Sequence, residues 1–113
     1  ELRCPDPSCN PYLGLTAMLT AGMEGVSKAM VPIEPLNDVN VYELSRKERR
    51  ARNIEELPGS LKEALLALEN DELIRSSLGE LLFESFTRGS WADWDEYHLS
   101  VSEWEVNHYL ETI

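Results

Sequence analysis

The sequence predicts a mainly α-helical chain with one short strand at its N-terminal end. Apolar residues recur at helical spacing in several segments, and helix-capping residues stand ahead of these segments. No segment alternates apolar and polar residues for long enough to form a sheet of its own. The length of 113 residues fits a single domain segment. We expect a strand over 1–5, a buried helix over 11–30, a loop over 31–45 and helices over 46–113.

The first predicted helix covers 11–30. Asn10 is a favourable N-cap residue, and Pro11 loses no hydrogen bond at the first helical position. The segment is apolar on nearly all sides, which predicts burial inside a larger body and an exposed apolar surface when that body is absent. The prolines of 31–45 then favour an extended surface loop.

Three capping signals predict the helices that follow. Ser followed three residues later by Glu lets the hydroxyl and the carboxylate satisfy free backbone N–H groups at a helix start. The pairs are Ser45–Glu48, Ser60–Glu63 and Ser102–Glu105. The first pair predicts a short helix over 46–52. After the second pair apolar residues continue at helical spacing, with interruptions at Asn70, Asp71 and Gly79.

The charge of the chain is strongly acidic but unevenly distributed. The sequence has 21 Asp and Glu against 10 Lys and Arg, a formal net charge of −11. Residues 46–52 nevertheless hold five Lys or Arg and one Glu. A nucleic acid needs a positive field over several phosphates and would meet mostly carboxylates on this chain, so we expect no nucleic-acid partner. We interpret 46–52 as a solvated helix face or a subunit contact.

Composition also indicates a cytoplasmic protein. The longest apolar stretch, 12–31, is interrupted by Glu24 and Lys28 and falls short of about 20 uninterrupted apolar residues, so we expect no membrane span. Cys4 and Cys9 lack the second pair or the histidines that a zinc site needs, and we interpret them as reduced thiols. No signal peptide is recognisable, and the absence of a starting Met suggests a piece of a longer protein.

The residues alone offer little catalytic chemistry. We find no nucleophile with a base, no Gly-rich phosphate loop and no paired-histidine metal motif. In an extended strand Glu1 and Arg3 would point to the same face. A carboxylate can hold a hard divalent cation, and a guanidinium can neutralise phosphate or carboxylate oxygens. Such a pair is as often a simple salt bridge.

Ordered motifs along the whole chain resemble the type I glutamine synthetases. Residues 1–13, ELRCPDPSCNPYL, are similar to the E-x-R-x-x-D-P-x-x-N-P-Y-L segment near the end of that family's catalytic domain. Residues 18–25 resemble its A-G-L-D-G turn of helix, and 57–65 resemble its L-P-x-S-L-x-E-A-L. Trp104 and Tyr109 fit the closing aromatic pattern. The chain is identified as a helical C-terminal part of an α+β glutamine synthetase catalytic domain, to whose sheet its first strand would belong.

The resemblance implies an activity and two site residues. The parent enzyme would make glutamine from glutamate and ammonia with ATP hydrolysis, through γ-glutamyl phosphate. It would use Mg²⁺ or Mn²⁺ as cofactor and ATP as co-substrate. Glu1 would be a metal ligand near the nucleotide phosphates, and Arg3 would be a catalytic residue that binds glutamate and the transferred phosphoryl group. The other site residues would lie elsewhere, so we expect the isolated chain to be inactive.

The resemblance also implies regulation and assembly. Tyr42 aligns with the tyrosine that some type I enzymes adenylylate, but residues 43–46 read ELSR where that branch has DLPP. We therefore expect the feedback-inhibited, non-adenylylated branch and a structural Tyr42. The parent enzyme would be a homo-oligomer, a dodecamer, with Trp104, Tyr109 and Leu110 as contact residues. The sequence leaves open whether a protein regulator binds. The alternative is a stand-alone helical oligomerisation or interaction module.

Overall fold

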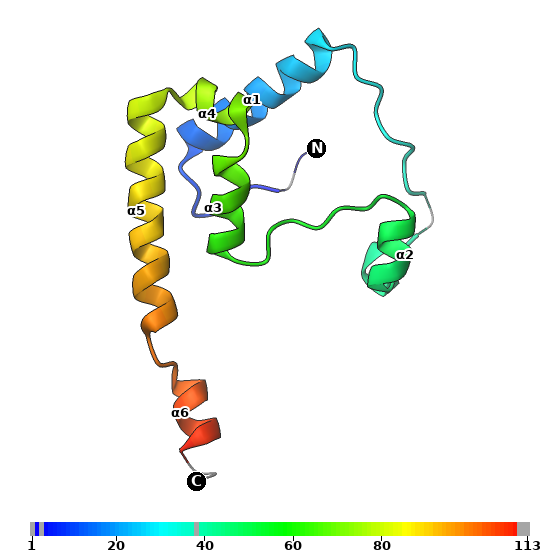
Figure 1. Cartoon of the computed structure of the whole chain (residues 1–113). Helices are drawn as coiled ribbons and strands as arrows, with labels where there is room; N and C mark the ends of the chain where they lie inside the picture. Colours follow the sequence, from blue (N-terminus) through cyan, green and yellow to red (C-terminus); the bar gives the residue numbers. More distant parts are fainter. Residues whose placement is uncertain (1, 3, 38, 111–113) are drawn as a thin grey trace. The chain divides into compact units, whose positions relative to one another are not determined.

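The computed structural model describes residues 2, 4–37 and 39–110, and all regular secondary structure among them is helical (Figure 1). Its elements are α1 (Pro11–Ser27), the 3₁₀ helix η1 (Val41–Glu43), α2 (Arg46–Ala51), α3 (Leu61–Glu69), α4 (Glu72–Leu78), α5 (Glu80–Leu99) and α6 (Glu103–Tyr109). The prediction of a mainly α chain is confirmed. Within the described residues, we find no helix that combines the length and the apolar character needed to span a membrane.

The predicted strand over 1–5 was wrong for this chain by itself. The described residues of that range, Leu2, Cys4 and Pro5, are not in a strand. Glu1 and Arg3 lie outside the described residues. A strand becomes regular when a neighbouring strand accepts and donates its ladder hydrogen bonds. No strand occurs among the described residues, so this segment has no such partner in the described chain.

The chain divides into two compact units, 1–58 and 59–113, which we describe separately. In the first unit α1 begins where the sequence predicts. The Asn10 side-chain oxygen accepts hydrogen bonds from the backbone N–H groups of Tyr12 at 3.0 Å and Leu13 at 3.5 Å. These bonds satisfy donors that the first helical turn leaves without partners.

Helix α1 ends at Ser27, three residues before the predicted end. Ala29 adopts φ 48°, the Ala29 N–H donates to the Val26 carbonyl, and the Met30 N–H donates to the Gly25 carbonyl at 2.9 Å. This hydrogen-bond pair is the Schellman motif that closes many helices. Helix α2 ends in the same way, with Asn53 at φ 54°.

The side chains of α1 are all exposed or partly exposed. Tyr12 and Val26 are among its most exposed apolar residues. The first unit therefore presents an apolar helix to solvent, as expected when the larger body is absent. Burial of this helix stays a prediction about a longer protein.

The segment over 31–45 is mostly loop, as predicted, but it contains η1. The Asn40 side-chain oxygen accepts from the Tyr42 N–H at 3.2 Å, and its amide nitrogen donates to the Glu43 carboxylate at 2.8 Å. These two hydrogen bonds of the Asn40 side chain cap the start of η1 and stabilise its single 3₁₀ turn. Helix α2 then starts at the Ser45–Glu48 capping box, as predicted.

The second unit has its core where α3, α4 and α5 pack on one another. Leu65 of α3 and Phe83 of α5 are the buried apolar side chains among the described residues. Thr87 is also buried, and its hydroxyl donates to the Phe83 carbonyl at 2.8 Å, so the core holds no unsatisfied hydroxyl there. The Trp91 indole N–H donates to the Glu69 carboxylate at 2.7 Å, which joins α5 to α3.

Gly79 separates α4 from α5, as the sequence predicts. Its backbone has φ 74° and ψ 156°, a region that is essentially restricted to glycine. The Asp71 carboxylate caps α4 by accepting from the Ile74 N–H at 3.0 Å. The capping residue and the glycine thus set both ends of this two-turn helix.

Helix α6 begins at the predicted capping box. The Glu105 carboxylate accepts from the Ser102 N–H and from the Ser102 hydroxyl, each at 2.8 Å, and the Glu105 N–H donates back at 3.2 Å. Ser60 caps α3 similarly, but there the Glu63 carboxylate accepts from the Gly59 N–H at 2.8 Å. Ser45, Ser60 and Ser102 therefore all cap their helices as predicted, and in the Ser60–Glu63 pair the carboxylate binds the N–H one residue before the cap.

Acidification is expected to loosen α6. The hydrogen bonds from the Ser102 N–H and hydroxyl lower the pKa of Glu105 below its usual 4.5. A lowered folded pKa stabilises the helix above the unfolded pKa, and this contribution is lost as pH falls through the folded value. The protection factors of the amides over 103–109, which are corrected for the intrinsic pH dependence of exchange, should therefore fall as the pH drops below about 4.5. In Glu105→Gln, which keeps the cap pattern without titrating, this loss of protection should be absent.

Candidate functional site

The two residues with an expected catalytic role, Glu1 and Arg3, lie outside the described residues. The residues directly after them form a compact turn. The Asp6 carboxylate accepts from the Ser8 N–H at 2.7 Å and from the Ser8 hydroxyl, and the Asp6 carbonyl accepts from the Cys9 N–H at 3.0 Å. The Ser8 hydroxyl and N–H lower the pKa of Asp6, so this carboxylate is an acceptor that shapes the turn.

The described residues do not by themselves fit a divalent metal ion. Among residues 2, 4–37 and 39–110, no three His, Cys, Asp or Glu side chains gather as a metal site would require. Mg²⁺ binds in octahedral oxygen geometry, so one carboxylate such as Glu1 needs ligands from elsewhere. Any site that includes Glu1 must draw most of its ligands from outside the described part of this chain.

Tyr42 lies in η1 and its side chain is 94% exposed. The backbone around it is fixed by the Asn40 cap, which positions the ring without burying it. Its phenol is therefore accessible in the first unit. The structural role expected for Tyr42 stays a prediction.

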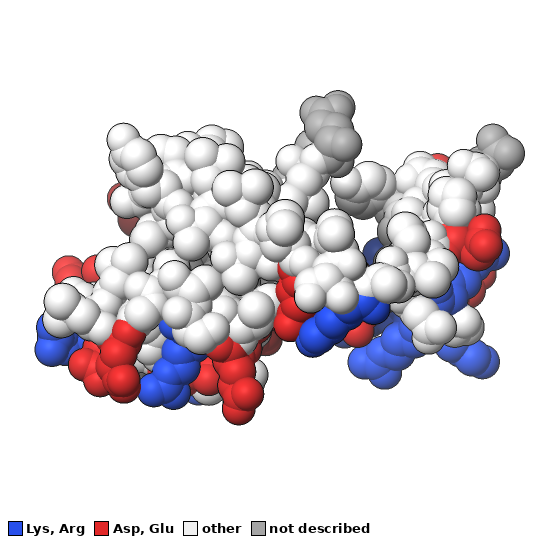
Figure 2. Space-filling model, turned by 90° about the horizontal axis from the view of Figure 1, so that it is seen from above, with Lys and Arg blue, Asp and Glu red and all other residues white. Residues whose placement is uncertain are grey.

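The basic run on α2 faces solvent. The Glu48 carboxylate accepts from the Ser45 N–H at 2.8 Å and from the Ser45 hydroxyl at 2.6 Å. The Arg49 guanidinium forms an ion pair with the Glu56 carboxylate at 2.8 Å. The other cations of the run, Arg46, Lys47, Arg50 and Arg52, are exposed. Figure 2 shows blue Lys and Arg side chains gathered on this part of the surface. This arrangement agrees with a solvated helix face.

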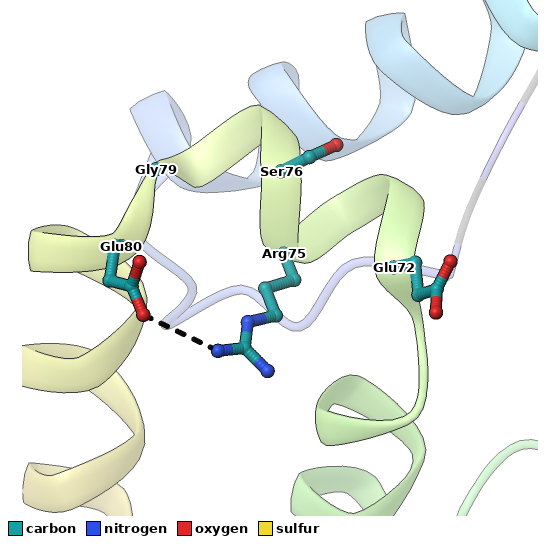
Figure 3. Close-up of a pocket in the computed structure, with 5 residues that line it drawn as sticks. All are labelled: Glu72, Arg75, Ser76, Gly79 and Glu80. Atoms are coloured by element: carbon teal, nitrogen blue, oxygen red, sulfur yellow. Dashed lines mark ion pairs between the residues drawn. The ribbon is translucent and has the colours of Figure 1, made fainter.

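An open hollow lies at the junction of α4 and α5 (Figure 3). It has a volume of about 420 Å³ and is lined by Glu72, Arg75, Ser76, Gly79 and Glu80. The Arg75 guanidinium lies 3.5 Å from the Glu80 carboxylate and 5.0 Å from the centre of the Phe83 ring. Because the Arg75 charge is engaged on both sides, we interpret the hollow as a helix junction and not as a ligand site.

The three expected contact residues of the tail lie on α6 or at its end and are exposed. The Trp104 ring stacks on His108 with centroids 4.7 Å apart and meets the edge of Tyr109 at 6.0 Å. Leu110 follows as the C-cap. The tail thus carries a clustered aromatic surface in which the His108 ring also takes part.

The structure brings together only part of the expected site set. Tyr42 belongs to the first unit, whereas Trp104, Tyr109 and Leu110 belong to the second. The hydrogen bond between Glu69 and Trp91 was missed by sequence reasoning, because the partners are 22 residues apart. Glu69 is the last residue of α3 and Trp91 lies near the middle of α5, and no local sequence motif indicates that the two residues pair.

Comparison with known proteins assigns the chain to a family. The family model described as "Glutamine synthetase, catalytic domain" matches residues 1–109. The chain belongs to the glutamine synthetase family. The resemblance found in the sequence motifs is thereby confirmed at the level of the family.

Individual relatives agree with this membership. The chain is 46% identical over 112 residues to the glutamine synthetase of Thermus thermophilus, which covers 99% of this chain and 25% of the relative. It is 44% identical over 113 residues to the glutamine synthetase of Methanosarcina mazei, and the match covers 100% of this chain and 25% of the relative. It is 52% identical over 111 residues to the glutamate–methylamine ligase of Methyloversatilis universalis, and the match covers 98% of this chain and 25% of the relative. The chain thus spans about a quarter of the length of the curated relatives it matches.

Proposed function

We propose that this chain is the C-terminal part of a glutamine synthetase catalytic domain and that the whole protein is an ATP-dependent glutamate–ammonia ligase of the cytoplasm. The match of the catalytic-domain family over 1–109 carries this proposal. In the proposed reaction ATP phosphorylates the side-chain carboxylate of glutamate, and ammonia displaces phosphate from the resulting γ-glutamyl phosphate. The substrates are small molecules, and we propose no nucleic-acid or membrane partner.

Arg3 is proposed as the catalytic residue that this chain contributes. Negative charge gathers on the phosphoryl oxygens as the phosphoryl group is transferred. A guanidinium presents several N–H donors in a fixed plane and can donate to two oxygens at once. Arg3 would therefore bind the substrate glutamate and stabilise the charge that develops during transfer.

Glu1 is proposed as one ligand of a Mg²⁺ or Mn²⁺ ion. The chemistry that such an ion supplies is neutralisation of phosphate charge. The described residues do not complete a site for it, so the proposal assigns the remaining ligands to residues beyond this chain. For the same reason we propose that the isolated chain does not make glutamine.

An assay of glutamine formation tests this proposal. The 113-residue chain, supplied with glutamate, ammonia, ATP and Mg²⁺, should form no glutamine, whereas a longer protein that contains it should do so. Glutamine formed by the isolated chain would refute the assignment of the other site residues elsewhere. An inactive longer protein would refute the activity itself.

A second candidate activity is glutamate–methylamine ligation. The 52% identity to a glutamate–methylamine ligase favours it. The two activities share the phosphorylation of glutamate and differ in the amine that attacks the acyl phosphate. The ratio of kcat/KM for methylamine and ammonia in the longer protein decides between them.

The finer branch assignment rests on the surroundings of Tyr42. Residues 43–46 read ELSR in place of DLPP, and α2 follows with its basic run. We propose on this basis the feedback-inhibited, non-adenylylated branch of type I enzymes. Tyr42 would then remain unmodified.

We also propose that the whole protein is a homo-oligomer, a dodecamer, with the α6 aromatic surface in its contacts. Exposure of Trp104, Tyr109 and Leu110 supports this role because large apolar side chains in one cluster favour association. The interaction-module alternative uses the same surface. Both readings leave room for a protein regulator at other surfaces.

Truncation after Ser100 is expected to abolish or weaken self-association. The shortened chain loses α6 and its aromatic cluster but keeps the α3–α5 core. Sedimentation velocity should show a smaller species than the 113-residue chain at the same concentration. A chain that ends at Leu110 is the control and should sediment as the full chain does. An unchanged distribution after truncation would exclude α6 as the interface.

A further inference from the structure

We propose that Cys4 and Cys9 form a reversible disulfide across the turn that precedes α1. The turn would then be a site of thiol oxidation and reduction. Both cysteines are free and exposed, and four residues separate them. Neither is explained by a zinc site, since the described residues contain no such group. Two accessible thiols in six residues are therefore free to react with each other.

The backbone between the two thiols is compact. The chain bends at Pro5, turns at Pro7 and Ser8, and bends again at Cys9. The hydrogen bond from the Cys9 N–H to the Asp6 carbonyl, at 3.0 Å, closes a β-turn. Such a turn places its first and last Cα atoms within about 7 Å of each other. Cys9 is thus held close to Asp6, only two residues from Cys4.

A disulfide needs the Cα atoms of its two cysteines about 4.4–6.8 Å apart. The turn holds Cys9 near Asp6, and ring formation requires the exposed segment at Cys4 to close on it. Two prolines restrict the backbone of the connecting segment, and the Asp6–Ser8 hydrogen bonds fix its middle. A short, stiff connection keeps the loop-closure entropy of the ring small.

Cys9 is anchored to α1. Its Sγ lies 3.3 Å from the position that a Cβ on Gly14 would occupy, so the thiol packs on the first turn of the helix. Cys9 directly precedes the N-cap Asn10, and Gly14 is the fourth residue of α1. This is the pair of positions that makes a staple contact at a helix start. A disulfide would therefore tie Cys4 to a residue that the helix already positions.

The reaction balances with a disulfide oxidant such as oxidised glutathione. The thiolate of one cysteine attacks the oxidant, which breaks its S–S bond, releases one glutathione thiolate and leaves a mixed disulfide on the protein. The thiolate of the other cysteine attacks the protein sulfur of this mixed disulfide and releases the second glutathione. Both released thiolates take up the protons that the two cysteines lost. One protein disulfide forms, and one oxidant disulfide is reduced.

A consequence for activity rests on the proposed function. Cys4 directly follows Arg3, and the ring would join the residue after Arg3 to the residue before the α1 cap. Oxidation would restrict the segment that bears the proposed catalytic residue. In the longer protein we expect glutamine synthesis to fall on oxidation and to recover with dithiothreitol.

The deciding experiment measures the mass of the 113-residue chain after equilibration with oxidised glutathione and quenching with iodoacetamide. We expect a monomer that has lost two hydrogen atoms and takes up no alkyl group, and that returns to two alkylated thiols with excess reduced glutathione. Stable glutathione adducts on both cysteines, or disulfide-linked dimers that increase with protein concentration, would overturn the proposal. This readout does not depend on glutamine synthesis, so its failure is distinguishable from failure of the proposed function.

Variants sharpen the assignment. Cys4→Ser and Cys9→Ser should each retain one stable glutathione adduct, because the resolving thiol is absent. Asp6→Ala removes the side-chain hydrogen bonds of the turn and keeps both thiols. We expect it to shift the ring equilibrium toward the open form by roughly fivefold or more, because each of the two lost hydrogen bonds supports a factor of about that size. Ser76→Ala is the matched control in the second unit and should leave the equilibrium unchanged.

Discussion

Leu65→Ala is expected to destabilise the second unit by about 2–5 kcal/mol, the usual cost of truncating a fully buried leucine. Leu65 is 2% exposed, the most deeply buried apolar side chain of the described residues. It lies on α3, which packs against both α4 and α5. Its removal leaves a cavity in a core that has few other buried side chains to close around it. Urea denaturation followed by tryptophan fluorescence measures the loss.

The neighbouring Leu66→Ala provides the control. It removes the same atoms from the same helix, but Leu66 is 43% exposed. We expect a loss below about 1 kcal/mol, because an exposed side chain gains little from folding. Equal losses in the two variants would show that burial in this core does not determine the stability of the unit.

The helix starts could be predicted because their causes are local. Ser45, Ser60 and Ser102 each cap a helix within three residues of themselves, and the same holds for Asn10. Gly79 likewise breaks the chain through its own backbone angles. A short stretch of sequence contains all the atoms that decide such a boundary, so a pattern of residue types predicts it.

The helix ends and the first strand depend on features that residue types in a short stretch of sequence do not indicate. Helix α1 stops because Ala29 takes a positive φ, and alanine gives no signal for that conformation. The strand over 1–5 needs a partner strand, and the described residues contain none. Such contacts between distant segments leave no local pattern. The Glu69–Trp91 hydrogen bond escaped prediction for the same reason.

The candidate site could be predicted only through family resemblance. Composition and spacing gave Glu1 and Arg3 no role beyond a carboxylate next to a guanidinium. The motif that surrounds them added the roles, because it aligns each residue with a family position. A site assembled from several segments of a longer protein cannot be read from the quarter of its length that this chain spans.

The largest functional effect is expected from Arg3. In a longer protein that contains this chain and makes glutamine, Arg3→Gln should lower kcat/KM for glutamate by about 10²–10³, the usual effect of removing one donor to developing negative charge. Gln keeps some hydrogen-bonding capacity but has no positive charge. Arg3→Lys should give an intermediate loss, since the ammonium keeps the charge but cannot donate to two oxygens in one plane.

The division of this loss between kcat and KM identifies what Arg3 does. If Arg3 acts mainly on the phosphoryl group, kcat falls and KM for glutamate changes little, because the interaction strengthens in the transition state. If it only binds glutamate, KM rises and kcat is retained. Arg46→Gln removes an exposed guanidinium of α2 and should leave both constants unchanged. If kcat and KM of Arg3→Gln stayed as close to the unmodified values as those of Arg46→Gln, Arg3 would be removed from the proposed catalytic machinery.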